Sequence, residues 1–159
     1  MNSPSSSAAF DPSNEIIYVS SLYKDEVYAY NSSTLKIQST ISTNGMVGYQ
    51  FGTGELYDPV NSLLYVACLG VNVSGITVIN TRNNSIAGVI DFGENNFTES
   101  MVLANAGRLF VSEGNHITEI NGTHIVANYS IGTMYNVPSS MHSMVHQIQV
   151  IWTTIFIMN

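Results

Sequence analysis

The sequence is short of charge, and above all of positive charge. Asp, Glu, Lys and Arg together make up 9% of its 159 residues, against about 25% in an average soluble domain. Lys and Arg number only four and Asp and Glu eleven, which gives a formal net charge of −7. With so few cations the chain has no basic stripe that could neutralise phosphates, so nucleic acid is excluded as a partner.

A surface with little charge has to be solvated by Asn, Ser, Thr and Tyr side chains. Protonating a few carboxylates changes the solvation of such a surface only slightly, so we expect the folded chain to tolerate acid. The composition therefore favours an extracellular setting.

Cysteine and long apolar runs are also scarce. The single cysteine, Cys68, excludes an internal disulfide and a thiolate metal cluster. It lies in the apolar run 64–69 (LYVACL), which predicts a buried, inert thiol. Residues 1–9 are Ser-rich and lack the basic and apolar parts of a secretory signal, so we expect no export signal in this chain. No run approaches the roughly 20 apolar residues of a membrane helix, so we expect no membrane span either.

What the chain does contain is a repeat. Residues 58–67 read DPVNSLLYVA, residues 11–20 read DPSNEIIYVS, and a worn third copy at 104–112 reads ANAGRLFVS. Tyr18 and Tyr65 are 47 residues apart, and Tyr65 and Phe110 are 45 apart. A period of this size indicates a repeat architecture.

Each unit is predicted to form four short strands separated by turns, and we find no convincing helix. The second strand of a unit is apolar almost throughout, so both of its faces should be covered, whereas the third alternates. Each third strand closes on an Asn that can cap the following turn (Asn31, Asn80 and Asn121). Four-stranded antiparallel units at this period are typical of β-propeller blades. The predicted strands are 7–10, 16–21, 27–31, 37–41, 56–57, 63–69, 76–80, 86–90, 101–103, 109–112, 117–121 and 125–131.

The same residues carry a family resemblance. Asp-Pro-x-Asn, followed by Ile-Tyr-Val or Leu-Tyr-Val and then by an apolar strand ending in Asn, resembles YVTN-type β-propeller repeats over about residues 3–141. Such repeats occur in prokaryotic, often archaeal, cell-surface and surface-layer-like proteins, so the resemblance implies a surface or binding role and leaves the ligand open. The chain departs from the pattern where Thr-Asn would follow Tyr-Val, at 20–21 (SS), 67–68 (AC) and 112–113 (SE), and its third unit lacks Asp-Pro.

The fold class we predict is all-β: a partial β-propeller of about three four-stranded antiparallel blades in an incomplete ring, since a closed ring has roughly four to eight. The blades fill residues 1–141, at about 3–51, 52–98 and 99–136, followed by the start of a fourth. Residues 142–159 form an atypical tail. Read one nucleotide back, codons for 141–148 (MHSMVHQI) can spell Ala-Phe-(Asp or Tyr)-Gly-Pro-Ser-Asn, close to residues 9–14 (AFDPSN), so one hypothesis is a frameshifted fourth blade.

An incomplete ring has a physical consequence. Each uncovered blade face would leave ~500 Å² of apolar surface exposed, or ~12 kcal/mol of lost burial, comparable with the whole stability of a domain. We therefore expect aggregation, pairing with remaining blades on another chain, or failure to fold alone.

Six Asn-x-Ser/Thr sequons are candidate N-glycosylation sites, and all but one fall in or beside predicted turns. The plainer interpretation is that Asn, Ser and Thr are simply turn residues here. The six acceptor residues are Asn31, Asn72, Asn83, Asn96, Asn121 and Asn128.

The other candidate residues favour structural roles. His142 and His146 have the spacing of a helical ligand pair but no third ligand nearby, so no metal site is predicted. His116 and His124 flank one strand and are expected to be solvated or hydrogen-bonded. Asp11 and Asp58 recur at one point of consecutive units; they could face an axial channel and bind a cation, but an Asp-Pro turn is favoured.

Glycines and tyrosines are interpreted in the same way. Gly48, Gly52 and Gly54 form an inter-blade linker rather than a nucleotide loop, because no helix follows them. Most tyrosines should pack between blades with the hydroxyl at the rim, and a sugar-binding aromatic face is the alternative.

We find no recurring acid–base pair with a nucleophile, no Gly-x-Ser-x-Gly and no cofactor fingerprint, so no catalytic, cofactor-binding or metal residue is predicted and the chain is not expected to be an enzyme. The favoured function is a non-catalytic cell-surface or extracellular β-propeller repeat fragment with a binding or structural role and an unknown ligand or surface partner. The alternative is an inactive remnant of a propeller enzyme such as a lactonase-like hydrolase. A cation held by acids of adjacent blades would favour the enzyme, and glycans on the turn Asn residues would favour the surface protein.

Overall fold

The computed structural model describes residues 5–21, 24–43, 54–69, 74–93, 98–113 and 115–131. These residues form twelve strands in three four-stranded antiparallel sheets, and the one helical element among them is the 3₁₀ turn η1 (Asn105–Gly107). The predicted all-β fold of three four-stranded blades is confirmed, and the ring is open. The strands are β1 (Ser5–Asp11), β2 (Ile16–Ser21), β3 (Glu26–Asn31), β4 (Ile37–Ser42), β5 (Glu55–Asp58), β6 (Leu63–Leu69), β7 (Ser74–Asn80), β8 (Ser85–Asp91), β9 (Thr98–Leu103), β10 (Arg108–Glu113), β11 (His116–Asn121) and β12 (His124–Ser130).

The three sheets share one topology, in which neighbours in sequence are neighbours in the sheet. Their orders are β1-β2-β3-β4, β5-β6-β7-β8 and β9-β10-β11-β12, and we call them blades 1, 2 and 3. The strand registers coincide as well, since Tyr18, Tyr65 and Phe110 pair with Ala9, Leu56 and Val102 on the first strand of each blade. The repeat read from the sequence is therefore a repeat of backbone pairing.

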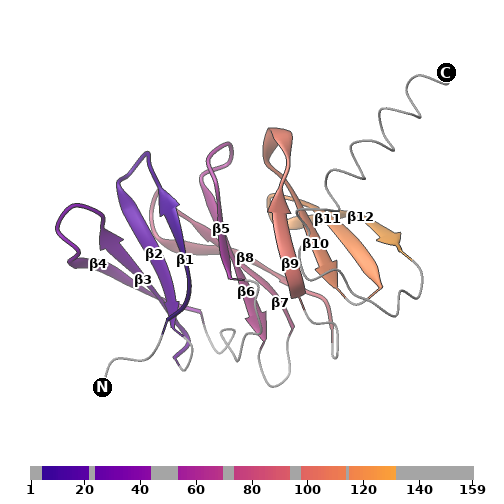
Figure 1. Cartoon of the computed structure of the whole chain (residues 1–159), viewed down its shortest axis with the longest axis horizontal. Coiled ribbons are helices and arrows are strands. Elements are labelled where there is room, and N and C mark those ends of the chain that lie inside the picture. Colours follow the sequence, from indigo (N-terminus) through magenta and orange to yellow (C-terminus); the bar gives the residue numbers. More distant parts are fainter. Residues whose placement is uncertain are drawn as a thin grey trace.

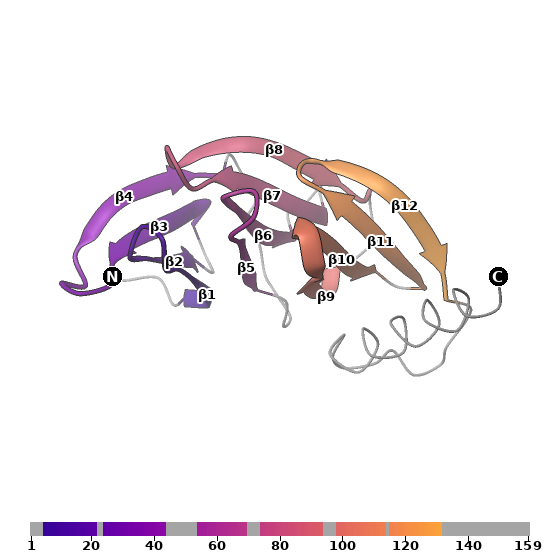
Figure 2. The same cartoon turned by 90° about the horizontal axis from the view of Figure 1, so that it is seen from above.

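The blades stand side by side as in part of a wheel. Their first strands, β1, β5 and β9, lie together on the concave side, where β1 contacts β5 and β5 contacts β9. Their fourth strands, β4, β8 and β12, run along the convex side (Figures 1 and 2). Blade 1 and blade 3 form the two ends of the arc and do not meet (Figure 2).

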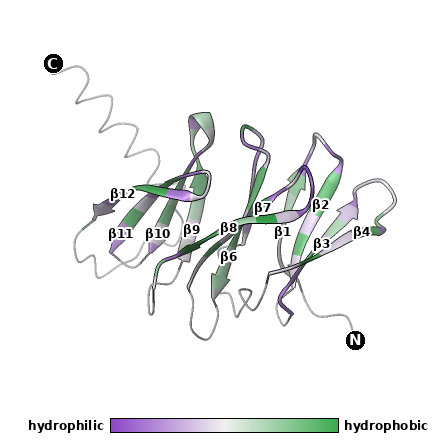
Figure 3. Cartoon of the chain, turned by 180° about the vertical axis from the view of Figure 1, so that it is seen from behind, coloured by the Kyte–Doolittle hydropathy of each residue, from purple (hydrophilic) through white to green (hydrophobic). Residues whose placement is uncertain are grey.

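The core consists of two apolar layers, one at each blade interface, and a smaller cluster on the outer side of blade 3, where Phe110 and Ile117 pack with Val102, Ala104 and Ile131. Leu64, Val66 and Ile79 of blade 2 pack toward blade 1 with Tyr18 and Val27. The opposite faces of β6 and β7 pack toward blade 3, through Tyr65, Ile76 and Val78 against Leu109, Val111 and Ile120. Figure 3 shows the hydrophobic residues along these middle strands. The prediction that the second strand is covered on both faces is thus confirmed for β6.

The turns after the third strands are closed by the expected Asn caps in blades 1 and 2. The Asn31 Oδ1 accepts hydrogen bonds from the Thr34 N–H at 2.8 Å and the Ser33 N–H at 3.2 Å. The Asn80 Oδ1 accepts from the Arg82 N–H at 2.9 Å. In each blade one residue of the turn between the third and fourth strands has a left-handed backbone, with φ of 54° at Leu35, 54° at Asn84 and 60° at Gly122.

Candidate functional site

The recurring Asp residues each close their own turn. The Asp11 Oδ1 accepts from the Ser13 N–H at 2.9 Å and the Asn14 N–H at 3.3 Å, and its Oδ2 accepts from the Asn14 Nδ2 at 2.8 Å. Asp58 makes the equivalent three bonds at 2.8, 3.3 and 2.7 Å with residues 60 and 61. Both carboxylates are fully buried. The turn interpretation is confirmed, because the carboxylate satisfies the N–H groups of the tight turn between the first two strands.

The third turn is built differently, by glycine instead of aspartate. Ala104 stands where Asp58 stands in blade 2, and η1 follows it, with φ of 63° at Ala106 and 72° at Gly107. A Cβ on Gly107 would lie 2.3 Å from the Asn61 Nδ2 and 3.0 Å from the Asp58 Oδ2. The Asp58–Asn61 pair of blade 2 thus fits directly against the blade 3 backbone, where only glycine leaves room.

Two tyrosines, one in blade 1 and one in blade 2, each reach from the second strand of their own blade to a turn of the next blade. The Tyr18 hydroxyl donates to the Asn84 Oδ1 in the β7–β8 turn at 2.8 Å. The Tyr65 hydroxyl, one repeat later, lies beside the backbone of Gly122 in the β11–β12 turn, but it is buried without a hydrogen-bond partner among the described residues. Both side chains are fully buried. We call these two contacts the tyrosine links; each joins the second strand of one blade to the left-handed turn residue of the following blade.

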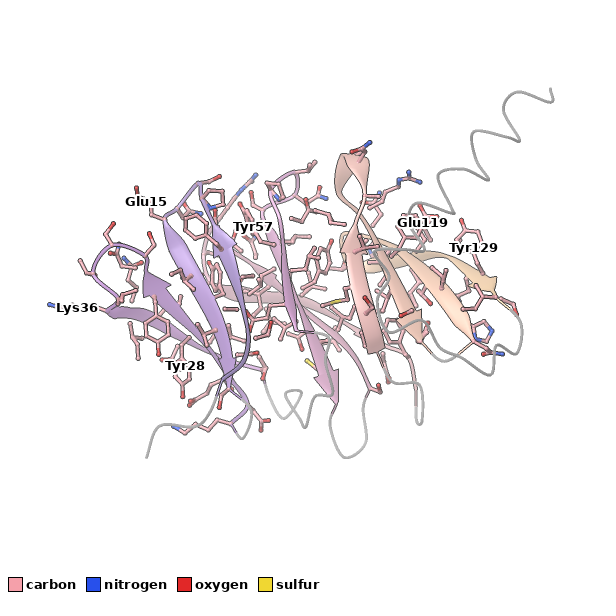
Figure 4. The ribbon with its side chains drawn as sticks, viewed as in Figure 1. Glu15, Tyr28, Lys36, Tyr57, Glu119 and Tyr129 are labelled. Atoms are coloured by element: carbon pink, nitrogen blue, oxygen red, sulfur yellow. The ribbon has the colours of Figure 1, made fainter. Side chains whose placement is uncertain are left out.

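Burial and the nearby carboxylates keep these phenols protonated. Burial, then Asp11, then Tyr57 raise the pKa of Tyr18 to about 12. Burial and then Asp58 raise the pKa of Tyr65 to about 12. Burial chiefly raises the pKa of Tyr57 too; the Ser13 hydroxyl lowers it and Asp11 raises it, and Figure 4 places this side chain between blades 1 and 2. These phenols are therefore not poised for proton transfer at neutral pH, and the Tyr18 hydroxyl donates the hydrogen bond that joins blade 1 to blade 2.

Glu55 is a buried carboxylic acid that sequence analysis missed. It lies on β5 with both carboxylate oxygens inaccessible to solvent, beside the Ser20 hydroxyl and the backbone of Ser20 and Ala9 in blade 1. Burial raises its pKa from 4.5 to about 7, although those neighbours lower it. Strand pairing puts Met101 at the same position in blade 3, where it packs against the core. A position-by-position alignment of the repeats would have shown that this acid stands at a position that is apolar in blade 3.

A pair of polar side chains on the second and third strands recurs in blades 2 and 3. The Cys68 Sγ lies 3.1 Å from the Thr77 Oγ1, and the Thr118 hydroxyl donates to Glu113 at the same positions of blade 3. Cys68 is 2% exposed, and burial chiefly raises the pKa of its thiol to about 11. The predicted buried thiol is confirmed. Glu113, also unexpected from the sequence, has its pKa raised by burial against the opposing effects of Thr118 and His116.

Three of the predicted glycosylation acceptors lie on equivalent turns of the three blades, along one rim of the arc. Asn31, Asn83 and Asn121 stand at the β3–β4, β7–β8 and β11–β12 turns. The bonds made by Asn31 and Asn83 use Oδ1 and not the amide nitrogen that a glycan would modify. Asn128 lies within β12, where its Oδ1 lies 2.7 Å from the Thr118 Oγ1. Asn72 and Asn96 lie outside the described residues.

The other predicted residues are not brought together. His116 and His124 are both exposed and begin antiparallel neighbours, so they lie at opposite ends of the β11–β12 pair. Gly54 is the only glycine of the expected linker within the described residues. His142, His146, Gly48, Gly52 and the tail 142–159 lie outside them. Within the described ranges, no group of three His, Cys, Asp or Glu side chains could hold a metal ion, and no helix has the length and apolarity to cross a membrane.

The chain resembles known proteins in its fold alone. No family model matches the sequence, and no curated protein matches it, so the YVTN resemblance stays a prediction. Among solved structures, Kuenenia stuttgartiensis hydrazine synthase matches with a TM-score of 0.66 and 15% identity, over 84% of this chain and 37% of that one. The β-propeller domain of Myceliophteria thermophila Cps50 (Swd1) matches with a TM-score of 0.60 and 12% identity, over 84% and 41%. The chain thus spans less than half of either structure, and its sheets are those of a β-propeller domain.

The Gly107 contact gives a first prediction. Gly107→Ala should lower the free energy of unfolding by about 2–4 kcal/mol, since its Cβ would clash with the Asp58–Asn61 pair and φ is positive. Gly93→Ala is the matched control: φ is 81° there and no atom lies within 4 Å of the added Cβ, so only about 1 kcal/mol of backbone cost is expected. Urea unfolding monitored by circular dichroism gives both values, and equal losses would contradict the packing described.

The first tyrosine link gives a second prediction. Tyr18→Phe should lower the free energy of unfolding by about 1–2 kcal/mol, because the Asn84 carbonyl loses a part-buried donor. Tyr28→Phe is the control: it removes a bond to Glu26 on the same strand, which should contribute under ~0.5 kcal/mol. If the two substitutions cost the same, the inter-blade bond is not what Tyr18 contributes.

Glu55 gives a third prediction, on pH. The folded carboxyl holds its proton up to about pH 7, whereas the unfolded one loses it near 4.5, so stability is greatest below about pH 4.5, falls up to about pH 7 and is then level. A pKa rise from 4.5 to about 7 corresponds to about 3 kcal/mol. Glu55→Gln should therefore raise the free energy of unfolding by about 2–3 kcal/mol at pH 8 and change it little at pH 4.

Unfolding curves from pH 4 to pH 8 measure this effect. Glu15→Gln removes an exposed carboxylate and matches the change in net charge, so it should keep the pH dependence of the parent chain. An unchanged slope in Glu55→Gln would show that the carboxyl is solvated in the folded state.

Proposed function

We propose that this chain is part of a non-catalytic β-propeller that works outside the cell or on its surface, in a binding or structural role. The observation that supports this most is the row of sequons Asn31, Asn83 and Asn121 on the same set of turns in three successive blades. Glycans attached there would all project from one rim and would not interrupt either apolar layer.

Composition supports the same proposal. The described surface is solvated mainly by uncharged polar groups, in keeping with a charged fraction of 9%. Glu55 adds to this, because a buried acid with its pKa raised to about 7 makes the fold more stable in mildly acidic surroundings than in alkaline ones. The carboxylates Asp11 and Asp58 hold their own turns together, which is a structural use of the residues that an enzyme would aim at its axis.

The proposal predicts a specific pattern of modification. When the full chain is secreted from a glycosylating host behind a heterologous signal, Asn121 and at least one of Asn31 and Asn83 should carry glycans, because their amide groups stand on accessible turns. Asn128 should stay unmodified, since it lies within β12 and its Oδ1 is bonded to Thr118. Peptide mass spectrometry after glycosidase treatment in heavy-oxygen water measures the occupancy of each site.

Variants separate the sites from general misfolding. Thr123→Ala should remove the glycan from Asn121 alone and leave the others. A secreted, folded chain with bare turn sites, or with Asn128 as its main site, would count against the surface assignment and leave the sequons as turn residues only.

A further inference from the structure

Both interfaces inside the chain use the same positions on the face that meets the preceding blade. In blade 2 this face carries Leu64 and Val66, and in blade 3 Leu109 and Val111, all 0% exposed. The equivalent residues of blade 1, Ile17 and Val19, are only partly buried. Phe10, at the position of Tyr57 in blade 2, is 51% exposed. Blade 1 therefore presents the apolar face that its two neighbours bury completely.

The third strand of blade 1 extends this face with aromatic side chains. Tyr28 and Tyr30 are stacked edge to face, with ring centroids 6.3 Å apart. They hold the positions of Thr77 and Ile79, of which Ile79 packs toward blade 1 in the first core layer. Figure 4 shows Tyr28 on the side of blade 1 away from blade 2.

The left-handed turn residue that lies next to each linking tyrosine has a counterpart on blade 1, although that counterpart lacks the side-chain acceptor of Asn84. Leu35, with φ of 54°, occupies the turn position of Asn84 and Gly122, the residues that receive Tyr18 and Tyr65. Its side chain is 67% exposed. No tyrosine of the described residues reaches this turn, because both linking tyrosines point to blades 2 and 3.

The far face of blade 3 does not match this surface. Phe110 replaces the linking tyrosine there, and the Arg108 guanidinium lies 5.6 Å from its ring centroid. Glu119 stands where blades 1 and 2 have Ala29 and Val78; it accepts from Arg108 at 3.1 Å and from the Tyr129 hydroxyl at 2.8 Å (Figure 4). Docking this face on another blade would bury a carboxylate and a guanidinium in an apolar layer, which is costly.

From this asymmetry we propose that the Ile17–Val19–Tyr28 face of blade 1 is a docking surface for one further blade of the same repeat type. The partner is a four-stranded antiparallel sheet whose second strand carries a tyrosine that reaches the Leu35 turn, as Tyr18 and Tyr65 reach theirs. It is not blade 3 of a second copy, because that blade has Phe110 and Glu119 in place of the tyrosine and the apolar residue.

An added blade tests the proposal directly. A copy of residues 54–97, with its own cysteine (the counterpart of Cys68) replaced by Ala, is joined ahead of Ser5 of the chain. This keeps the natural spacing, because Ser5 and Thr98 pair with Ser21 and Glu113 at the same register of their blades. Val19→Cys reports on the face through its rate of thiol modification, and Cys68 contributes little background because burial raises its pKa to about 11.

The expected result is that Val19→Cys reacts readily in the parent chain and at least tenfold more slowly once the blade is added. Replacing the tyrosine of the added copy (the counterpart of Tyr65) by Ala should restore at least part of the reactivity. Val66→Cys in the parent chain gives the rate for a fully covered position.

Two results would overturn the proposal. First, Val19→Cys in the extended chain could react as fast as in the parent chain. This result counts against the proposal even if the added residues fail to fold, because the face is proposed to template the folding of that blade. Alternatively, Val19→Cys could already be protected in the parent, with protection that grows with protein concentration, in which case a second copy of this chain covers the face.

Discussion

A sheet with two apolar faces needs a sheet on each side of it, and this requirement governs the whole molecule. Blade 2 meets it, since the residues of β6 are buried alternately toward blade 1 and toward blade 3. Blades 1 and 3 each have one such neighbour within the described part of the chain. Their outer faces differ accordingly: blade 1 has aromatic and aliphatic side chains, and blade 3 has the Arg108–Glu119 ion pair beside the small apolar cluster of Phe110 and Ile117. Face-to-face burial of strands is the dominant favourable term here, as in any β-structure built from stacked sheets.

Polar contacts at the turns fix how those sheets are placed relative to one another. Apolar packing has little direction, so it does not by itself set the angle or the height of neighbouring blades. The bond from Tyr18 to Asn84 and the fit of Gly107 against Asn61 are directional and short-ranged. Both join a strand or turn of one blade to a turn of the adjacent one. Polar residues at the rim thus supply the orientation, and the core supplies the free energy.

Much of this could be predicted from the sequence, because a repeat presents the same strand pattern three times. The position of β6 between two neighbours followed from its unbroken apolar run, and the role of Asp11 from the chemistry of Asp-Pro turns. Glu55 and Glu119 could not be placed in this way. Each is a single acid within an apolar strand position, and only the pairing of strands shows which neighbours Glu55 and Glu119 meet. The Gly107 contact joins residues 46 positions apart and likewise depends on the stacking of blades.

One regular feature of the strands bears on a hazard that every open sheet faces. The pairing of third and fourth strands skips one residue at the same place in all three blades: Gln38 on β4, Ala87 on β8 and Val126 on β12. Such bulges bend and twist the strand that carries them, which makes its free backbone a poor template for another chain. Lys and Arg number only four in the whole sequence, so positive charge gives the three outer strand edges little protection against pairing with another chain. It is the bent backbone of these edges that opposes fibril-like association between molecules.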